Sequence, residues 1–221
     1  MKKIEDGIIC EDEYKDSNLK ILWILKEGNV AEADEDIKRD ICEEIRNEYH
    51  LKNALSIPTF RKMIYATYGI LHSDVEWNNV PYANELNAYN VLKKVAYINI
   101  NKMPGKGTAI YSVIKDAYEE NEELLISQIK EFNPNIIIFG NTLHFFNNEK
   151  LQSIGWNYLN TTKMCYDYNN ESKSTAFYLM SNDRLIINAY HPAYPRISNY
   201  QYWLEIKTAV HIWIEKMKSK S

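Results

Sequence analysis

The chain has 221 residues, with 26 Lys and Arg against 30 Asp and Glu, 45% hydrophobic and 13% aromatic residues. This length is typical of one domain with a single core, and the low content of Gly and Pro excludes a disordered or fibrous chain. No apolar run approaches the ~18 residues of a membrane span, and the acidic start is unlike a signal peptide.

Cysteine usage and charge distribution narrow the class further. Cys10, Cys42 and Cys165 are widely spaced, so we expect reduced thiols in a cytoplasmic protein without a membrane partner. The first 50 residues hold 8 basic and 15 acidic side chains, whereas the other 171 hold 18 basic and 15 acidic ones. We therefore do not expect the first segment to face nucleic-acid phosphates, although an ordinary solvated acidic surface would look the same.

Four short runs rich in β-branched and aromatic residues predict strands. In chain order they are Lys20–Leu25, Val95–Asn101, Asn135–Gly140 and Leu185–Tyr190. Because nearly continuous apolar runs are typical of strands covered on both faces, we expect a four-stranded parallel sheet between two layers of helices.

The segments between the strands predict those helices. Helical composition or spacing occurs at Ile37–Tyr49, Thr59–Ile70 and Asn121–Phe132, and the last segment repeats apolar residues every three to four positions from Trp203 to Met217. A hairpin is predicted from Tyr158–Tyr168 and Ser174–Met180. The prediction is one α/β domain, residues 1–221, built as a three-layer α/β/α sandwich, with an acidic N-terminal segment (1–19) and a helical region (30–94).

Polar residues lie near the carboxyl end of each predicted strand or just after it, at the edge where open parallel sheets bind ligands. They are Glu27 and Asn29, then Asn99, Asn101 and Lys102, then Asn141 and Thr142, and finally His191, Tyr194 and Arg196. Structural alternatives exist: Glu27 as a helix cap, Asn99 as a partner of backbone groups, and His191 as part of a strand stop at Pro192. The chain lacks a GxxxxGK[ST] phosphate loop and a GxSxG nucleophile elbow, which disfavours nucleotide triphosphatases and serine hydrolases of those types.

In this order the motifs resemble the uracil-DNA glycosylase superfamily, most closely its iron–sulfur-type bacterial and archaeal branch. The first strand ends in KEGN (26–29), where that branch has a GEAPG-like motif; NINKMP (99–104) is similar to TNxxKxxPP, and NAYHPAYPR (188–196) to TYHPSxxLR. A further match is IKEFNPNIIIFG (129–140). Lys26, Asn29 and Ala193 replace an expected Gly, Pro and Ser, and Met103 stands where a cluster cysteine is expected. We therefore expect no iron–sulfur cluster and no other cofactor.

The resemblance implies an enzyme that flips uracil or a related deaminated base out of DNA, single- or double-stranded, and hydrolyses its N-glycosidic bond. It implies a catalytic role for His191, donating to uracil O2, and for Glu27 and Asn29, positioning the attacking water. It implies that Asn99 reads the base, that Gly28, Asn101 and Tyr194 contact it, and that phosphates are bound by Lys102, Lys106 and Arg196.

Two alternatives stay open. One is a catalytically weak or inactive module on the same fold that binds a base, a nucleotide or DNA; Lys26, Ala193 and the acidic first segment favour it. The other is a different nucleotide-binding α/β enzyme, against which the missing phosphate loop weighs. A fold resemblance by itself does not decide among them.

Overall fold

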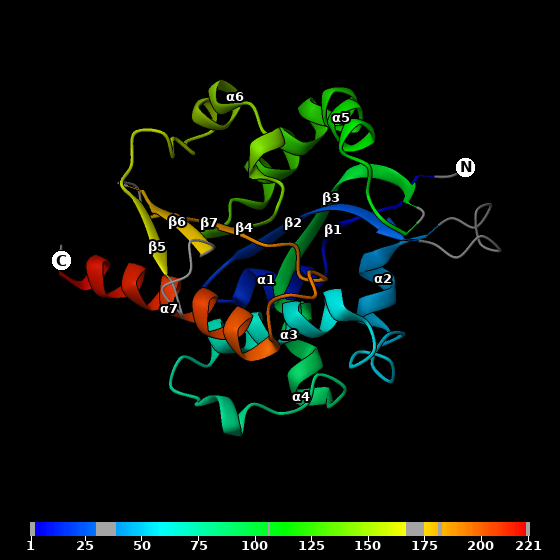
Figure 1. The fold of residues 1–221 in the computed structure, drawn as a ribbon, viewed down its shortest axis with the longest axis vertical. Helices are drawn as coiled ribbons and strands as arrows, with labels where there is room; N and C mark the ends of the chain where they lie inside the picture. Colours follow the sequence, from blue (N-terminus) through cyan, green and yellow to red (C-terminus); the bar gives the residue numbers. More distant parts are fainter. Residues whose placement is uncertain (1–2, 30–38, 106, 167–174, 181–182, 220–221) are drawn as a thin grey trace.

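The computed structural model describes residues 3–29, 39–105, 107–166, 175–180 and 183–219 (Figure 1). Its centre is a seven-stranded sheet of order β1-β3-β2-β4-β7-β6-β5. The strands are β1 (Gly7–Ile8), β2 (Ile21–Asn29), β3 (Val95–Gly105), β4 (Ile136–Gly140), β5 (Lys163–Tyr166), β6 (Thr175–Leu179) and β7 (Leu185–Ala189).

The helices are α1 (Glu11–Asp16), α2 (Ile41–Arg46), α3 (Pro58–Leu71), α4 (Leu86–Tyr89), α5 (Tyr111–Phe132), α6 (Asn148–Ser153) and α7 (Asn199–Lys218). Short 3₁₀ turns cover Trp77–Asn79, Asn90–Lys94 and Leu143–Phe145. The α/β class is therefore confirmed. Helix α5 begins well before the predicted Asn121, and the described part of the predicted helix at 37–49 is helical only over α2.

The expectation of a four-stranded parallel sheet is wrong, because the sheet is mixed and has seven strands. The four predicted strands do form its contiguous parallel centre, β3-β2-β4-β7. The predicted hairpin adds β6 and β5 antiparallel beside β7, and the acidic N-terminal segment adds β1 antiparallel beside β3. A two-residue strand such as β1 is too short to show any hydrophobic period.

Helices cover both faces of the sheet, and each face has its own apolar core. Alternate residues of β2 supply them: Trp23 and Leu25 pack with α3 and α7, whereas Leu22 and Ile24 pack with α5. The apolar stripe of α7 is buried at Trp203, Ile206, Val210 and Trp213, as its spacing predicts. In Figure 1, α5 and α6 lie above the sheet and α3 and α7 below it.

The parallel centre fixes where a site can form. Strands β2, β3, β4 and β7 run in the same direction, so their carboxyl ends meet at one edge of the sheet, on the right of Figure 1. No helix within the described ranges is both long and apolar enough to cross a membrane.

Candidate functional site

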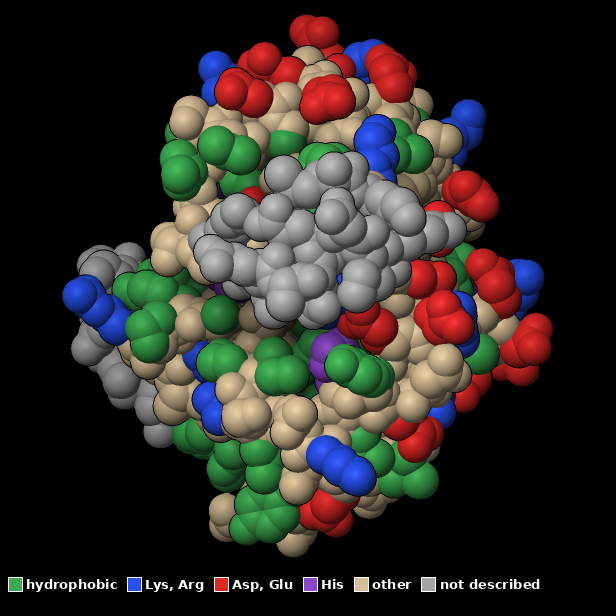
Figure 2. All heavy atoms as spheres, turned by 90° about the vertical axis from the view of Figure 1, so that its right-hand side faces the viewer, with side chains coloured by type: hydrophobic (Ala, Val, Ile, Leu, Met, Phe, Trp, Pro, Cys, Tyr) green, Lys and Arg blue, Asp and Glu red, His purple; other side chains and the backbone are tan. Residues whose placement is uncertain are grey.

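A cleft of about 750 Å³ opens at the carboxyl ends of β2, β4 and β7. Its floor is the end of β2, from Leu25 to Gly28, and its walls come from Asn141 after β4 and from Tyr190 and His191 after β7. Asn141 has a left-handed backbone (φ 58°), a conformation that Asn tolerates better than most residues. The cleft thus lies where parallel α/β sheets bind ligands, and Figure 2 views the molecule from this edge.

His191 lines the cleft as a neutral ring with a defined tautomer. The backbone N–H of Ala193 donates to its Nδ1 at 3.1 Å, so Nδ1 carries no proton and the neutral ring holds its proton on Nε2. Burial, together with the positive charges of Lys26 and Lys62, lowers the pKa of His191 to about 4. At neutral pH this side chain is therefore a hydrogen-bond donor without a charge.

Two stacked tyrosines form the wall beside His191. The rings of Tyr190 and Tyr194 lie 5.0 Å apart between centroids and are nearly parallel, at 11°. The main chain under them is fixed, because Tyr202 donates to the Tyr190 carbonyl at 3.0 Å and Lys62 to the Tyr194 carbonyl at 2.6 Å. The predicted substrate-contacting Tyr194 thus lines the cleft, stacked on Tyr190.

Glu27 also lines the cleft, next to Gly28. Its Oε2 accepts from Asn101 Nδ2 at 3.2 Å, and Asn101 Oδ1 accepts from the Met103 N–H at 2.9 Å. The carboxylate packs on Gly105, where any Cβ would overlap it. Asn101 is buried and outside the cleft lining, so it positions Glu27 and does not itself reach a ligand.

The catalytic candidate Asn29 is described only in its main chain, which pairs with Gly105 at the end of β2. Its side chain, like the whole of Lys106, lies outside the described residues.

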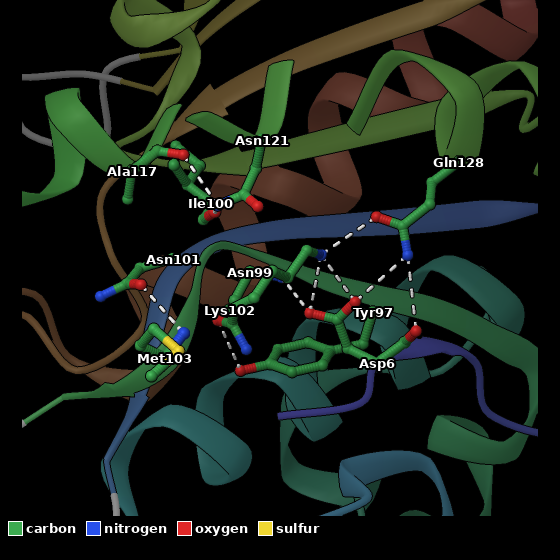
Figure 3. A network of polar contacts seen from close by, with 10 residues as sticks. All are labelled: Asp6, Tyr97, Asn99, Ile100, Asn101, Lys102, Met103, Ala117, Asn121 and Gln128. Atoms are coloured by element: carbon green, nitrogen blue, oxygen red, sulfur yellow. Dashed lines mark hydrogen bonds and ion pairs between the residues drawn. The ribbon is translucent and has the colours of Figure 1, made fainter. Parts of the chain in front are cut away.

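The predicted base-reading residue, Asn99, does not line the cleft. Its side chain is 0% exposed, and its Oδ1 accepts from the Tyr97 hydroxyl at 3.1 Å (Figure 3). Its Nδ2 is buried without a hydrogen-bond partner among the described atoms. Gly28 separates it from the cleft, with Nδ2 only 3.8 Å from where a Cβ of residue 28 would lie. Direct base reading by Asn99 is therefore not supported by this geometry.

Lys102, predicted to bind phosphate, is turned into the protein. Its side chain is 4% exposed, and Nζ lies 2.7 Å from Asp6 Oδ1 and 3.0 Å from Gln128 Oε1 (Figure 3). Burial lowers the pKa of Lys102, while the Asp6 carboxylate acts in the opposite direction. Its ammonium group is already paired with Asp6 and does not line the cleft, so the geometry does not support the phosphate-binding prediction.

Other cations lie closer to the opening. Arg196 is exposed in the turn before α7, which suits the predicted phosphate contact. Lys26 lines the cleft itself; burial lowers its pKa, and the neighbouring Glu27 opposes that shift. The residue that replaces an expected glycine thus brings a positive charge to the cleft.

Sequence reasoning missed a polar cluster on the α2 side of the cleft. Arg39 donates two hydrogen bonds to Glu44, at 2.6 and 2.8 Å, and His50 Nε2 lies 2.8 Å from the same carboxylate. Although burial raises the pKa of Glu44, the hydrogen bonds from His50 and Arg39 lower it to about 2. Arg39 and His50 line the cleft with Phe60, and no motif in the sequence marks them.

No group of three or more His, Cys, Asp and Glu among the described residues is placed to hold a metal ion. No protein-family model matches the chain, and no curated protein matches it significantly. The chemistry of the cleft therefore carries the functional argument.

Proposed function

We propose that the protein is a DNA glycosylase-like N-glycosidase that takes a flipped uracil, or a related deaminated base, into the cleft and hydrolyses its bond to the sugar. One observation carries the proposal. A neutral His191, with its proton held on Nε2, lines the same cavity as a carboxylate, Glu27, and a stacked aromatic pair, Tyr190 and Tyr194.

The base-leaving half of the reaction suits this histidine. When the C1′–N1 bond breaks, its electron pair stays on the base, and negative charge spreads to uracil O2. A hydrogen bond from His191 Nε2–H stabilises that charge as an oxyanion-hole donor does. The pKa of about 4 means that the ring enters the reaction uncharged, and the positive charge of Lys26 in the same cleft favours an anionic leaving group.

The sugar half suits Glu27. Loss of the base leaves a cationic, oxocarbenium-like sugar, which a carboxylate stabilises. The same carboxylate orients the attacking water and accepts its proton as the oxygen bonds to C1′. The base anion then takes up a proton from solvent. Asn101 holds Glu27 by a 3.2 Å hydrogen bond, which limits the conformations that the carboxylate can adopt.

The size and lining of the cleft fit a nucleotide. Its volume of about 750 Å³ falls within the ~300–1,000 Å³ typical of small-molecule sites. Tyr190, Tyr194 and Phe60 supply apolar faces, and Lys26, Glu27 and His191 supply a few polar groups among them.

A second candidate is a module that binds a base or nucleotide without cleaving it. The burial of Asn99 behind Gly28 favours it, because the amide expected to select uracil does not face the cleft. Under this reading the cleft still binds an aromatic base, but the glycosidic bond stays intact.

The test is release of uracil from single- and double-stranded oligonucleotides in EDTA, followed by alkaline cleavage of the abasic strand. We expect excision by the unmodified protein and a loss of about 10²–10³-fold in single-turnover rate for His191→Ala, the usual cost of removing one oxyanion-hole donor. His211→Ala is the matched control, because His211 is exposed on α7 and outside the cleft lining.

Binding of the uracil oligonucleotide without strand cleavage, even at long times, would favour the second candidate. Excision that is equally fast in His191→Ala and His211→Ala would contradict the assigned role of His191. If the protein neither binds the uracil oligonucleotides nor excises uracil from them, the proposal is overturned altogether.

A further inference from the structure

An exposed group of residues, here called the aromatic lip, borders the cleft where α5 begins. It consists of Ile110, Tyr111, Val113 and His144. Ile110 is 63% exposed and Tyr111 62% exposed, and contiguous exposed apolar side chains often mark an interaction or ligand-binding site. The Tyr111 and His144 rings are nearly parallel, at 6°, with centroids 5.9 Å apart. Tyr111 and His144 thus form a stacked aromatic pair whose two members are both exposed to solvent.

The aromatic lip is continuous with the cleft on two chain segments. Thr108 and Ala109 line the cleft, and Ile110 and Tyr111 follow them directly. Asn141 lines the cleft as well, and His144 follows in the next turn. Burial lowers the pKa of His144, and the positive charge of Lys26 adds to this shift. Because Lys26 lines the cleft, this charge interaction is consistent with a lip that lies close to the cleft.

The aromatic lip is also firmly supported. Tyr111 packs on the buried Phe145, with centroids 5.1 Å apart. Thr142, just before the turn that carries His144, donates to the Ile24 carbonyl of β2 at 2.8 Å. A preorganised aromatic surface loses little entropy when a planar partner stacks on it.

The charges on α5 restrict which ligands can lie against the aromatic lip. The first turn of α5 has no acidic residue, but the later exposed face of the helix carries Asp116, Glu119, Glu120 and Glu123. In Figure 2, acidic side chains gather at the top of this edge of the molecule, over α5, with hydrophobic side chains below them. Lys115 pairs with Glu119 and Lys150 with Glu123, but the acidic residues of this face still outnumber its lysines and disfavour a phosphate backbone there. The lip has no acidic residue, so a nucleic-acid strand would pass along the lip.

We propose that the aromatic lip stacks the base adjacent to the one in the cleft, so that the substrate is a single-stranded nucleic acid and not a free nucleoside. The inference rests on the proposed function for the base inside the cleft. Aromatic side chains stack on any base, and such stacking is a common way of holding single strands. A base inside a duplex already stacks on its neighbours and would have to leave them to reach Tyr111.

The experiment measures binding, so that it does not depend on excision. Two probes are used. The first is a fluorescein-labelled single-stranded DNA of 15 nucleotides that contains one uracil, with a 2′-fluorine on the sugar of that nucleotide to slow cleavage. The second is free 2′-deoxyuridine. We expect Tyr111→Ala to weaken oligonucleotide binding about tenfold, within the range of one lost base–aromatic stack, and to leave deoxyuridine binding unchanged. Tyr111→Trp should restore oligonucleotide binding.

Tyr82→Ala is the matched control, because Tyr82 is 68% exposed and outside the cleft lining. Equal oligonucleotide affinity for Tyr111→Ala and the unmodified protein would overturn the inference, even if excision is observed. So would an equal loss of deoxyuridine binding, or a Tyr111→Ala effect seen only on self-association in sedimentation. If excision is absent but Tyr111→Ala still weakens strand binding selectively, the proposed function fails and the role of the lip stands.

Discussion

The ends of β7 and β3 make an instructive comparison, because both carry polar residues that the sequence places at the same edge of the sheet. At the end of β7, His191 and Tyr194 open onto the cleft. From the middle of β3 toward its carboxyl end, the side chains of Asn99, Asn101 and Lys102 are all buried and hydrogen-bonded within the protein. One strand end forms a site and the other forms a structural network.

The difference arises from what covers each strand end. The N-terminal segment lies along β3, and Asp6 accepts hydrogen bonds from the Asn99 N–H and from the Lys102 ammonium. At β7, Pro192 cannot continue the ladder, and the chain turns so that His191 remains at the opening. A polar residue at a strand end is therefore available for chemistry only where no other segment supplies its partner.

The largest expected effect is on stability, at the β3 end. Lys102→Met should lower the free energy of unfolding by about 3–5 kcal/mol, because it leaves the buried Asp6 carboxylate without its counter-charge. Arg196→Met, at the exposed position after β7, should change it by less than about 0.5 kcal/mol. Urea denaturation of the two variants measures both values.

Equal free energies of unfolding for Lys102→Met and Arg196→Met would show that the ion pair between Lys102 and Asp6 does not stabilise the fold. A loss of oligonucleotide binding in Lys102→Met at unchanged stability would restore its predicted phosphate contact.

A smaller effect, on activity, is expected where the two regions meet. Gly105→Ala should displace the Glu27 carboxylate from Asn101, because the new Cβ overlaps it. We expect a loss of ~100-fold in excision rate, the scale of a 1 Å misplacement, with about 1 kcal/mol of stability lost. If Glu27 mediates the effect, adding Gly105→Ala to the Glu27→Gln variant should cause little further loss of excision rate. Fully additive rate losses would contradict this link.

The smallest effect is a pH dependence at the β7 end. The pKa of His191 is lowered from 6.5 to about 4, so the unfolded chain binds more protons between these values. The neutral His191 ring therefore contributes fully to stability above pH 6.5, and this contribution is lost as the pH falls toward 4. His191→Gln should therefore lose less stability than the unmodified protein between pH 7 and pH 5, as measured by urea denaturation. His211→Gln should behave like the unmodified protein, and an identical slope in all three would exclude the buried neutral ring.

The sequence predicts the parallel centre and places Glu27 and His191 at one edge of the sheet, because buried strands have continuous apolar runs and parallel strand ends share an edge. In the structure both residues line the cleft. It does not predict the burial of Lys102, since the partner Asp6 lies far away in the chain and belongs to a segment interpreted as a solvated acidic surface. The cluster of Arg39, Glu44 and His50 likewise depends on tertiary contacts that no local pattern records.

The central claim is that His191 is a neutral Nε2–H donor facing a cleft that binds a nucleobase. The most direct test is a ¹H–¹⁵N NMR spectrum of the histidine rings, recorded with and without free uracil from pH 7 to pH 5. The account predicts that His191 stays neutral with Nε2 protonated throughout, and that its Nε2–H signal shifts when uracil is added. A ring that becomes charged near pH 6.5, or a signal indifferent to uracil, would contradict it.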